Sequence, residues 1–422
     1  MRRHLGCSFV ALMSGCTLLA PFGDLSTGDV DGSVVGGDGG VCLTRPMTPA
    51  DDPFPTPTGI EICNRLDDDG DGRVDRDTLV VEAVRGVGGL TRVLDARGMR
   101  GGAEDRIAIV ASVGDGIAES LQLAEVFLPE GFDPIVSTLV EGEVVGFDGA
   151  RVRDGYAIAY SVGGEILLGV ASDCNLTFGE RTTVVATGAA SHVRVAAITP
   201  VNVLVTWQLD AGGIGAALVD VRTRPSVEAM HDSLLTDVGY TAGRHPEPLV
   251  DGSGNGQVTF TARDGSGAED VFVRPVGGAL GAVVTVTFDP FYGEGPFADP
   301  VGATTSNGAV WIAFDVEAVS GPAYITASTG GGRQYGPPAE ILAIASSDTP
   351  DVGVLLEFAG TPLIERVGPT VEGSFSQDTD GPRLALERWR DLVGLPQGRT
   401  RYVGVATRGG GALAIQRVGC FE

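Results

Sequence analysis

The chain has 422 residues, of which 43% are apolar, so it can bury a sizeable core, which argues against global disorder. Its formal net charge is −26, and such a surface repels nucleic acids and anionic lipid headgroups. With 64 glycines, 24 prolines and only 6% aromatic residues, the composition favours many short strands joined by tight turns.

The N-terminus has the layout of a secretory signal. Arg2 and Arg3 precede an apolar run that is far shorter than the ~20 residues needed to span a membrane. The segment LMSGC resembles a bacterial lipobox, with Met13 where leucine is usual. The resemblance implies that residues 1–15 are removed and that Cys16 carries a lipid anchoring the protein to a membrane. Ordinary secretion is the alternative, so we expect a location in the cell envelope, as an outer-membrane lipoprotein, or outside the cell.

Residues 16–60 form a tether in this interpretation. They are rich in Gly, Asp, Thr and Pro, as in GDVDGSVVGGDGG, and contain few large apolar residues. Such a segment cannot bury enough apolar area to offset the entropy lost on ordering. We therefore predict a disordered spacer between the anchor and the folded body.

Residues 61–77 contain an acidic motif, CNRLDDDGDGRVD, with alternating aspartates followed by Gly72. Carboxylates at alternate positions of a tight loop converge on one point, and Ca²⁺ takes six to eight such oxygen ligands. A solvated acidic turn is the alternative. The predicted structural Ca²⁺ site comprises Asp67, Asp69, Asp71, the carbonyl of Arg73, Asp75 and Asp77.

The same stretch resembles the MopE-type metal-binding motif of bacterial surface proteins. Cys63, Asn64 and the aspartates match, whereas Gly70 stands where that motif has a second cysteine. The resemblance covers about twenty residues and implies a surface protein with a structural divalent-cation site. Disulfide candidates are Cys42, Cys63 and Cys420, paired as Cys42–Cys63 or Cys63–Cys420, with Cys174 the remaining cysteine of the exported chain.

From about residue 78 the chain repeats one pattern: an apolar strand, a Gly/Asp turn and a second apolar strand, usually followed by a weaker third. The first strands begin near residues 106, 155, 201, 256, 309, 352 and 401. This period, with four short strands per unit, is typical of β-propellers, in which stacking in a ring buries the faces of each unit. We predict that residues 78–422 form an all-β, seven-bladed β-propeller, with six blades or tandem β-sandwiches as alternatives.

The two ends of this body complement each other. The last repeat stops after its second apolar strand, ALAIQRV, and the segment TLVVEAV (78–84) precedes the first repeat without a partner. We predict that 78–84 supplies the missing outer strand and closes the ring. The segment 383–394 has the pattern of a short helix, but the number of blades requires an inner strand there.

Candidates for catalysis are few. Segments 172–178 and 328–336 resemble degenerate Asp boxes of sialidase-like propellers, which implies turns remote from any chemistry. A sialidase needs arginines that grip a carboxylate and a Tyr–Glu pair. Tyr292 and Glu294 lie two residues apart in a Gly/Pro loop, and the arginines that can face the channel are Arg194, Arg244 and Arg274. The segment 251–256, DGSGNG, echoes the acidic motif, although a hairpin turn is favoured.

These observations predict a monomeric, non-enzymatic cell-surface lipoprotein whose propeller binds a protein or a glycan, and no nucleic acid. The alternative is a secreted sialidase-like glycoside hydrolase or lyase that uses the central channel. Buried acids with perturbed pKa and arginines at one mouth of the ring would favour the alternative. A channel lined by Val, Ala and Thr would favour binding or scaffolding.

Overall fold

The structure is a computed structural model that describes residues 80–419 apart from several segments. These segments are 104–105, 115–117, 130–132, 174, 237–238, 264, 288–295, 306–307, 317–322, 329–331, 336–338, 347–351, 359–360, 368–387 and 397–399. The chain divides into two compact units, Met1–Val41 and Cys42–Glu422, and all described residues belong to the second. The predicted signal, tether, acidic motif and all six cysteines lie outside the described residues.

The described residues of the second unit form seven antiparallel sheets. Six are built from strands that follow one another along the chain, and the last also takes two short strands from the beginning of the body. The innermost strands are β3 (Val93–Arg100), β7 (Val144–Val152), β11 (Ala190–Thr199), β15 (Thr241–Val250), β19 (Phe297–Thr304), β23 (Ala339–Ser346) and β26 (Trp389–Gly394). The second strands are β4 (Arg106–Gly114), β8 (Gly155–Val162), β12 (Asn202–Leu209), β16 (Gly256–Arg263), β20 (Val310–Val316), β24 (Val352–Phe358) and β27 (Thr400–Thr407).

The outer half of each sheet completes the pattern. The third strands are β5 (Ala118–Phe127), β9 (Glu165–Ser172), β13 (Ile214–Asp220), β17 (Glu269–Pro275), β21 (Ala323–Ala327), β25 (Thr361–Val367) and β28 (Leu413–Gly419). In five sheets the outermost strands are β6 (Ile135–Glu141), β10 (Thr182–Thr187), β14 (Ser226–His231), β18 (Val284–Thr285) and β22 (Gly332–Tyr335). The sheet of β23, β24 and β25 has three strands among the described residues, and the last sheet has two short outermost strands, β1 (Val80–Val81) and β2 (Arg85–Gly86). A 3-10 turn, Gly409–Gly411, links β27 to β28.

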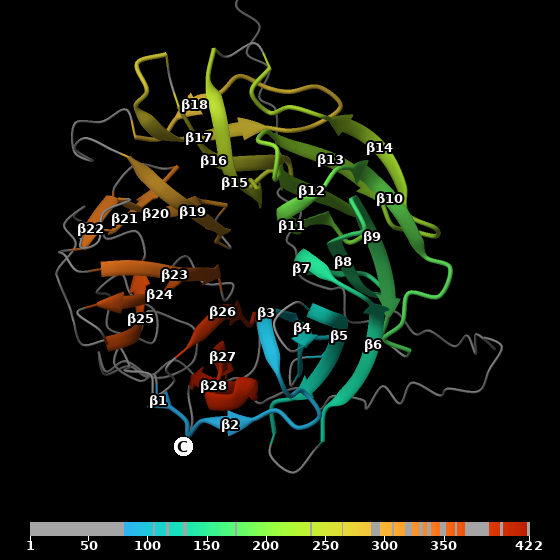
Figure 1. Cartoon of the computed structure of the whole chain (residues 1–422). Coiled ribbons are helices and arrows are strands. Elements are labelled where there is room, and N and C mark those ends of the chain that lie inside the picture. The colour runs from blue at the N-terminus through green and yellow to red at the C-terminus, as the bar shows by residue number, and fades with distance from the viewer. Residues whose placement is uncertain are drawn as a thin grey trace, which may run out of the picture. The chain divides into compact units, whose positions relative to one another are not determined.

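The sheets follow one another around a central channel, as Figure 1 shows. Each inner strand contacts the inner strand of the next sheet, and β26 contacts β3, so the circle of inner strands is closed. The predicted all-β propeller is therefore confirmed. The alternative of tandem β-sandwiches is wrong, because consecutive sheets lie side by side around one axis.

One prediction about strand order was wrong. The seven recurring apolar strands are the second strands of their sheets, not the first. The inner strands precede them and escaped notice because they mix charged residues, glycine and proline with apolar ones, as in TAGRHPEPLV of β15. The exception is the segment around Trp389–Gly394, where the predicted inner strand is present as β26.

The predicted closure of the ring is confirmed. In the last sheet β28 pairs on one side with β27 and on the other with β1 and β2. Val80 lies opposite Gly419 and Arg85 lies opposite Ile415, and the amide of Glu82 donates a hydrogen bond to the carbonyl of Arg417 at 3.0 Å. A strand from the beginning of the body thus completes a sheet whose other three strands come from its end.

The core lies between neighbouring sheets. One cluster joins β8 and β9 to β11, β12 and β13, and includes Trp207, which is 2% exposed. Second strands are buried along nearly their whole length, which explains why their sequences read as continuous apolar runs. The segment 251–255 forms the turn between β15 and β16, in which Asp251 accepts hydrogen bonds from the amides of Ser253 and Asn255 at 2.8 Å. The hairpin interpretation of this segment is thus confirmed.

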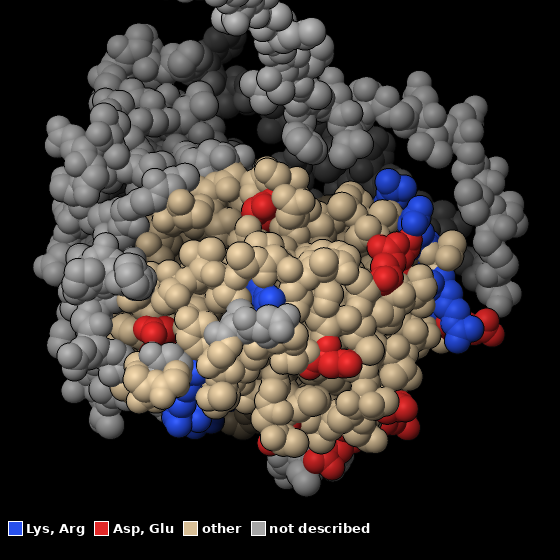
Figure 2. Space-filling view, turned by 90° about the horizontal axis from the view of Figure 1, so that it is seen from above, with Lys and Arg blue, Asp and Glu red and all other residues tan. Residues whose placement is uncertain are grey.

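On the face shown in Figure 2, charged side chains lie in small separate groups, several of them acidic. Within the described ranges, no helix has the length and apolar character needed to cross a membrane.

Candidate functional site at the mouth of the channel

Every inner strand carries a β-bulge. The register between inner and second strand shifts in all seven sheets, for example between Val93 and Asp95 in β3 and between Ala190 and His192 in β11. A bulge places two residues opposite one and turns a side chain to a new direction. In β3, β11, β15 and β19 the bulges lie close to charged residues, so they help to direct these side chains.

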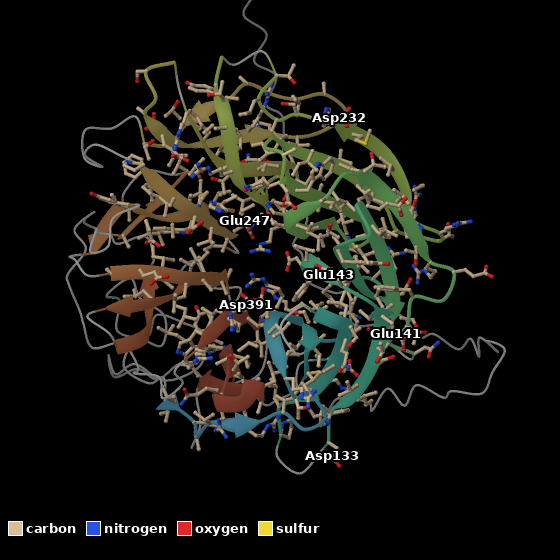
Figure 3. The ribbon with its side chains drawn as sticks, in the orientation of Figure 1. Asp133, Glu141, Glu143, Asp232, Glu247 and Asp391 are labelled. Atoms are coloured by element: carbon tan, nitrogen blue, oxygen red, sulfur yellow. The ribbon has the colours of Figure 1, made fainter. Side chains whose placement is uncertain are left out.

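After the first bulge, each inner strand has one residue that pairs with a residue in the middle of the second strand. Around the ring from β3, these mid-channel residues are Arg97, Asp148, Arg194, Glu247, Val301, Ala343 and Asp391. Because β26 is next to β3, five consecutive sheets carry charges of alternating sign, and the sheets of β19 and β23 carry small apolar residues. Figure 3 shows Glu247 and Asp391 beside the central channel.

Two of these carboxylates tie neighbouring inner strands together. Asp391 Oδ2 accepts a hydrogen bond from the amide of Gly98 at 2.7 Å, and Asp148 Oδ2 accepts one from the amide of Val195 at 3.0 Å. Burial raises the pKa of Asp391 to about 6, against the lowering effect of Arg97. Each carboxylate accepts a hydrogen bond from a backbone amide of the neighbouring sheet. These bonds join adjacent sheets, so the role of the two carboxylates is structural.

A cavity of about 410 Å³ opens above these residues, at the end of the channel where the inner strands begin. It lies between β3, β7 and β11, where Gly146 contributes no side chain. Its lining combines charged, hydroxyl and apolar groups: Leu94, Asp95, Arg97, Ser112, Glu143, Val144, Val145, Gly146, Phe147, Ser191, His192 and Arg194.

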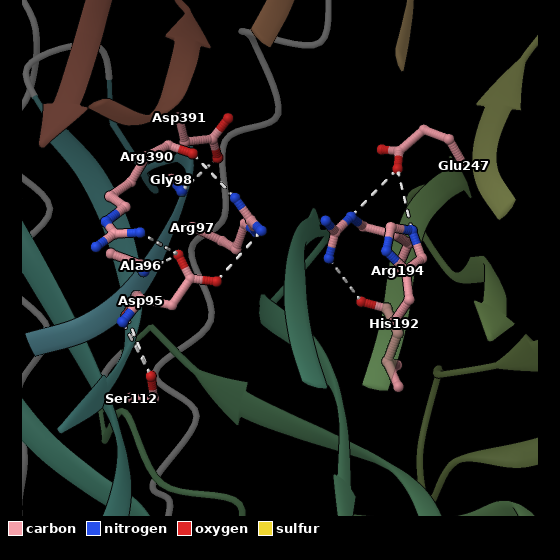
Figure 4. Close-up of polar contacts among 11 residues, drawn as sticks. Asp95, Ala96, Arg97, Gly98, Ser112, His192, Arg194, Glu247, Arg390 and Asp391 are labelled. Atoms are coloured by element: carbon pink, nitrogen blue, oxygen red, sulfur yellow. Dashed lines mark hydrogen bonds and ion pairs between the residues drawn. The ribbon is translucent and has the colours of Figure 1, made fainter. Parts of the chain in front are cut away.

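Ion pairs lie on two sides of this cavity, and Figure 4 draws their contacts. On one side Arg97 lies 3.2 Å from Asp95 and donates a hydrogen bond to the carbonyl of Arg390 at 2.9 Å. On the other side the Nε of Arg194 donates to Glu247 Oε2 at 3.2 Å. The Nε of Arg97 and the Nε2 of His192 are buried, and neither has a hydrogen-bond partner among the described residues.

Further along the same mouth, β15 and β19 bring His245 and Asp299 together. The Nδ1 of His245 lies 2.8 Å from Asp299 Oδ1, and the two side chains are 34% and 63% exposed. The ring of His245 meets the ring of His192 edge to face, with centroids 5.5 Å apart. We call Asp95, Arg97, His192, Arg194, His245, Glu247 and Asp299 the mouth cluster.

Burial and charge perturb the pKa of several groups in this cluster. Burial raises the pKa of Glu247 to about 7, although Arg194 acts to lower it. Burial lowers the pKa of His192 well below its usual value, and Arg194 and His245 act in the same direction, so this imidazole is neutral near neutral pH. The neighbouring side chain of His245 lowers the pKa of Asp299 and keeps it ionised.

A second buried ion network lies at the opposite end of the strands, between the sheets of β4 and β8. Glu125 is 1% exposed; its Oε1 accepts a hydrogen bond from the hydroxyl of Tyr156 at 2.9 Å and its Oε2 one from Arg106 at 3.1 Å. Arg151 lies over the ring of Tyr156, 5.0 Å from its centroid, and pairs with Asp173. We call these five residues the lower network.

The structure brings only one of the predicted site arginines to the mouth. Arg194 lines the cavity, whereas Arg244 extends toward Glu269 at 3.7 Å. Buried Arg274 donates hydrogen bonds to the carbonyls of Leu234, Thr236 and Gly281. Tyr292 and Glu294 lie outside the described residues, as do the Ca²⁺ ligands Asp67, Asp69, Asp71, Arg73, Asp75 and Asp77.

The described residues of the segment 172–178 form a turn after β9. Ser172 accepts hydrogen bonds from the amides of Asn175 and Leu176, and Phe178 stacks on Tyr160 with centroids 5.6 Å apart. The turn is packed against its own sheet and is absent from the cavity lining. Within the described ranges, no group of three or more His, Cys, Asp or Glu side chains is arranged to hold a metal ion.

Sequence reasoning missed most of the mouth cluster because it missed the inner strands. A signal was present: charged residues recur at a nearly constant distance ahead of the recurring apolar strands, as Arg97, Asp148, Arg194 and Glu247 do. Because these residues lie at nearly equal distances ahead of the recurring strands, an alignment of the repeats would have predicted that they lie at the same depth of the channel.

Comparisons with known proteins support the fold. No known family model matches the chain, and no curated protein matches its sequence. Among solved structures, a polysaccharide lyase of family PL25, an ulvan lyase bound to -[GlcA(1-4)Rha3S]-, has a TM-score of 0.53 at 9% identity and covers 80% of this chain and 96% of its own. The lectin BP39L from Burkholderia pseudomallei has a TM-score of 0.52 at 14% identity, with coverages of 77% and 95%. The WD40 domain of Toxoplasma gondii coronin has a TM-score of 0.51 at 10% identity, with coverages of 82% and 87%.

Proposed function

We propose that the propeller binds a glycan in the cavity at the mouth of the channel. The observation that supports this most directly is the cavity itself, whose volume of about 410 Å³ is typical of small-molecule sites. Sugar hydroxyls both donate and accept hydrogen bonds, and the lining offers guanidinium donors, carboxylate acceptors and serine hydroxyls together. The buried Nε of Arg97 has no hydrogen-bond partner among the described residues, so a ligand or water can supply the acceptor.

The chain's other features complete the proposal. The propeller of this proposal has seven blades, which the seven sheets support. A cell-surface lipoprotein anchored through Cys16, with a structural Ca²⁺ loop at residues 61–77, would present this propeller to glycans outside the cytoplasm. Both a lectin and a polysaccharide lyase share the fold, so the fold by itself is compatible with binding alone or with cleavage.

A glycoside hydrolase or lyase is the second candidate, and one observation favours it. The lining of the channel mouth includes acids, arginines and a histidine beside its apolar residues, and the pKa of Glu247 is raised to about 7. Part of this charge is structural, because Asp148 and Asp391 bond to backbone amides of neighbouring strands. The groups that remain for chemistry are those of the mouth cluster.

The test is binding of the full chain to a glycan microarray, with two matched variants. Val145 lines the cavity and is 53% exposed, so Val145→Trp fills the mouth without disturbing the core. Val184 on the outer strand β10 is 44% exposed, so Val184→Trp makes the same change away from the channel. We expect Val145→Trp to weaken glycan binding by about tenfold or more, as for a loss of roughly 1.4 kcal/mol, and Val184→Trp to leave it unchanged. Equal binding by both variants would place the site elsewhere, and the absence of any bound glycan would contradict the proposal.

A further inference from the structure

His245 is held in a strained backbone conformation by its neighbours. Its φ is +48° and that of Asp299 is +47°, in the left-handed region that residues other than glycine rarely adopt. Both residues lie at bulges of consecutive inner strands, and the amide of His245 donates a hydrogen bond to Gln208 Oε1 at 2.8 Å. Such strain persists where the surrounding structure imposes it, often at functional sites.

The pairing with Asp299 determines what the imidazole of His245 can do. A carboxylate 2.8 Å from Nδ1, outside hydrogen-bond geometry, favours a proton on that nitrogen by its charge, and this leaves a lone pair on Nε2. The Nε2 makes no hydrogen bond with the described residues, and the side chain is 34% exposed at the mouth. An oriented imidazole with a free and accessible nitrogen is suited to act as a general base.

The cavity beside this pair is suited to a carboxylated sugar. Arg97 of β3 and Arg194 of β11 line it from two sides, and both can donate to a carboxylate. His192 also lines the cavity and contacts the ring of His245, so a sugar held there lies next to the base. Glu247 adjoins the same groups, 3.2 Å from Arg194 and 3.9 Å from His192.

We propose that this site cleaves 4-linked uronate polysaccharides by β-elimination, with His245 as the base, Asp299 as its positioning residue and Glu247 as the acid. The inference rests on the proposed function, because the glycan must first bind in the mouth cavity. Its substrate class follows from the two arginines, which would neutralise the negative charge that develops on the uronate carboxylate when the neighbouring proton leaves.

The reaction balances without water, an oxidant or a reductant. The Nε2 of His245 takes the proton from C5 of the uronate, and the electron pair of that C–H bond forms the C4=C5 double bond. The C4–O bond breaks, and its electron pair leaves with the glycosidic oxygen, which takes a proton from Glu247. His245 then loses its proton to solvent, and Glu247 takes a proton from solvent. A carboxyl group that stays protonated near neutral pH is suited to the acid role, and burial gives Glu247 that property by raising its pKa to about 7.

The experiment uses the full chain with polygalacturonate, alginate and hyaluronan, and follows the ultraviolet absorbance of the unsaturated uronate product. His245→Gln removes the base, and His231→Gln makes the same change on β14, where His231 contacts the carbonyl of Gly277 far from the mouth. We expect at least one polymer to give product with the wild type and with His231→Gln, and a rate about 100-fold lower with His245→Gln. Binding of that polymer should change less than threefold. Asp299→Asn should lower kcat while KM stays nearly constant.

The failures of the two proposals are distinguishable. Binding of a uronan without any product would overturn the elimination proposal and leave glycan binding in place. Equal rates for His245→Gln and the wild type would show that another group is the base. If neither these polymers nor any arrayed glycan binds, both proposals are contradicted.

Discussion

The lower network and the mouth cluster are both groups of charged side chains, yet only the mouth cluster contributes residues to the lining of the cavity. Glu125 uses both carboxylate oxygens, bonded to Tyr156 and Arg106. In the mouth cluster, by contrast, Arg97, His192 and Arg194 line the cavity at the channel mouth. The comparison separates charges that join two neighbouring sheets from charges that border an open cavity.

The largest expected effect comes from breaking the lower network. Glu125→Leu leaves the hydroxyl of Tyr156 and the guanidinium of Arg106 without this acceptor. Removing one partner from a buried pair costs about 3 kcal/mol or more, so the free energy of unfolding should fall by about that amount in urea denaturation. Glycan binding at the folded mouth should stay unchanged. A variant as stable as the wild type would mean that this network does not stabilise the fold.

A smaller effect, which depends on pH, is expected in the mouth cluster: the free energy of unfolding should fall as the pH rises. Burial raises the pKa of Glu247 from 4.5 to about 7, so the folded protein binds this proton more tightly than the unfolded chain. The contribution of Glu247 to the free energy of unfolding is therefore present below about pH 4.5 and is lost as the pH rises to about 7. Between about pH 5 and pH 8, the wild type should lose about 1–3 kcal/mol more stability than Glu247→Gln. Parallel losses, measured by urea unfolding at both pH values, would show that Glu247 ionises normally.

A third test separates stability from function at the strained positions. Glycine accepts the φ of +48° at His245 without strain, and the exposed ion pair that is lost is worth under about 1 kcal/mol. His245→Gly should therefore keep the free energy of unfolding or raise it by up to about 1 kcal/mol, while elimination activity disappears. Ala242→Gly, with φ +51° on the same strand, is the matched control and should keep the activity. A strongly destabilised His245→Gly would mean that His245 stabilises the fold, as the residues of the lower network do.

The smallest effect is expected at an exposed ion pair that belongs to neither group. Arg222 pairs with Asp220 near the end of β13, and its side chain is 65% exposed. Solvent screens such a pair, so Arg222→Ala should shift neither the thermal midpoint nor glycan binding beyond experimental scatter. A measurable loss of binding in this variant would indicate that changes of surface charge, rather than the mouth cluster, control the interaction.

The sequence predicted the architecture better than the site, and the reason is physical. Second strands such as β8 are buried on both faces, so their residues form apolar runs that recur visibly along the chain. The partnerless segment at 78–84 was enough to predict ring closure. An inner strand, in contrast, has a bulge and faces a polar channel, so neither a period of two nor an apolar run marks it.

The missed residues show the same limit. The contact between His245 and Asp299 depends on bulges in two strands that belong to different sheets. A bulge moves a side chain to the other face, and a single sequence does not specify where it occurs. Arg194 was identified as a channel residue by its type alone, and the same reasoning wrongly included Arg244 and Arg274, whose partners lie within their own sheet and in the turn after β14.

Closure of the last sheet by β1 and β2 has a consequence for synthesis. A ribosome releases the segment around Val80 first and β28 last, so the early strand waits without its hydrogen-bonding neighbour until almost the whole polypeptide has emerged. A message truncated before Leu413 would yield a product with open edges at both of its ends, exposed to self-association and to proteases. The ring can therefore close, and its edge strands become paired, only after the chain has been translated through β28.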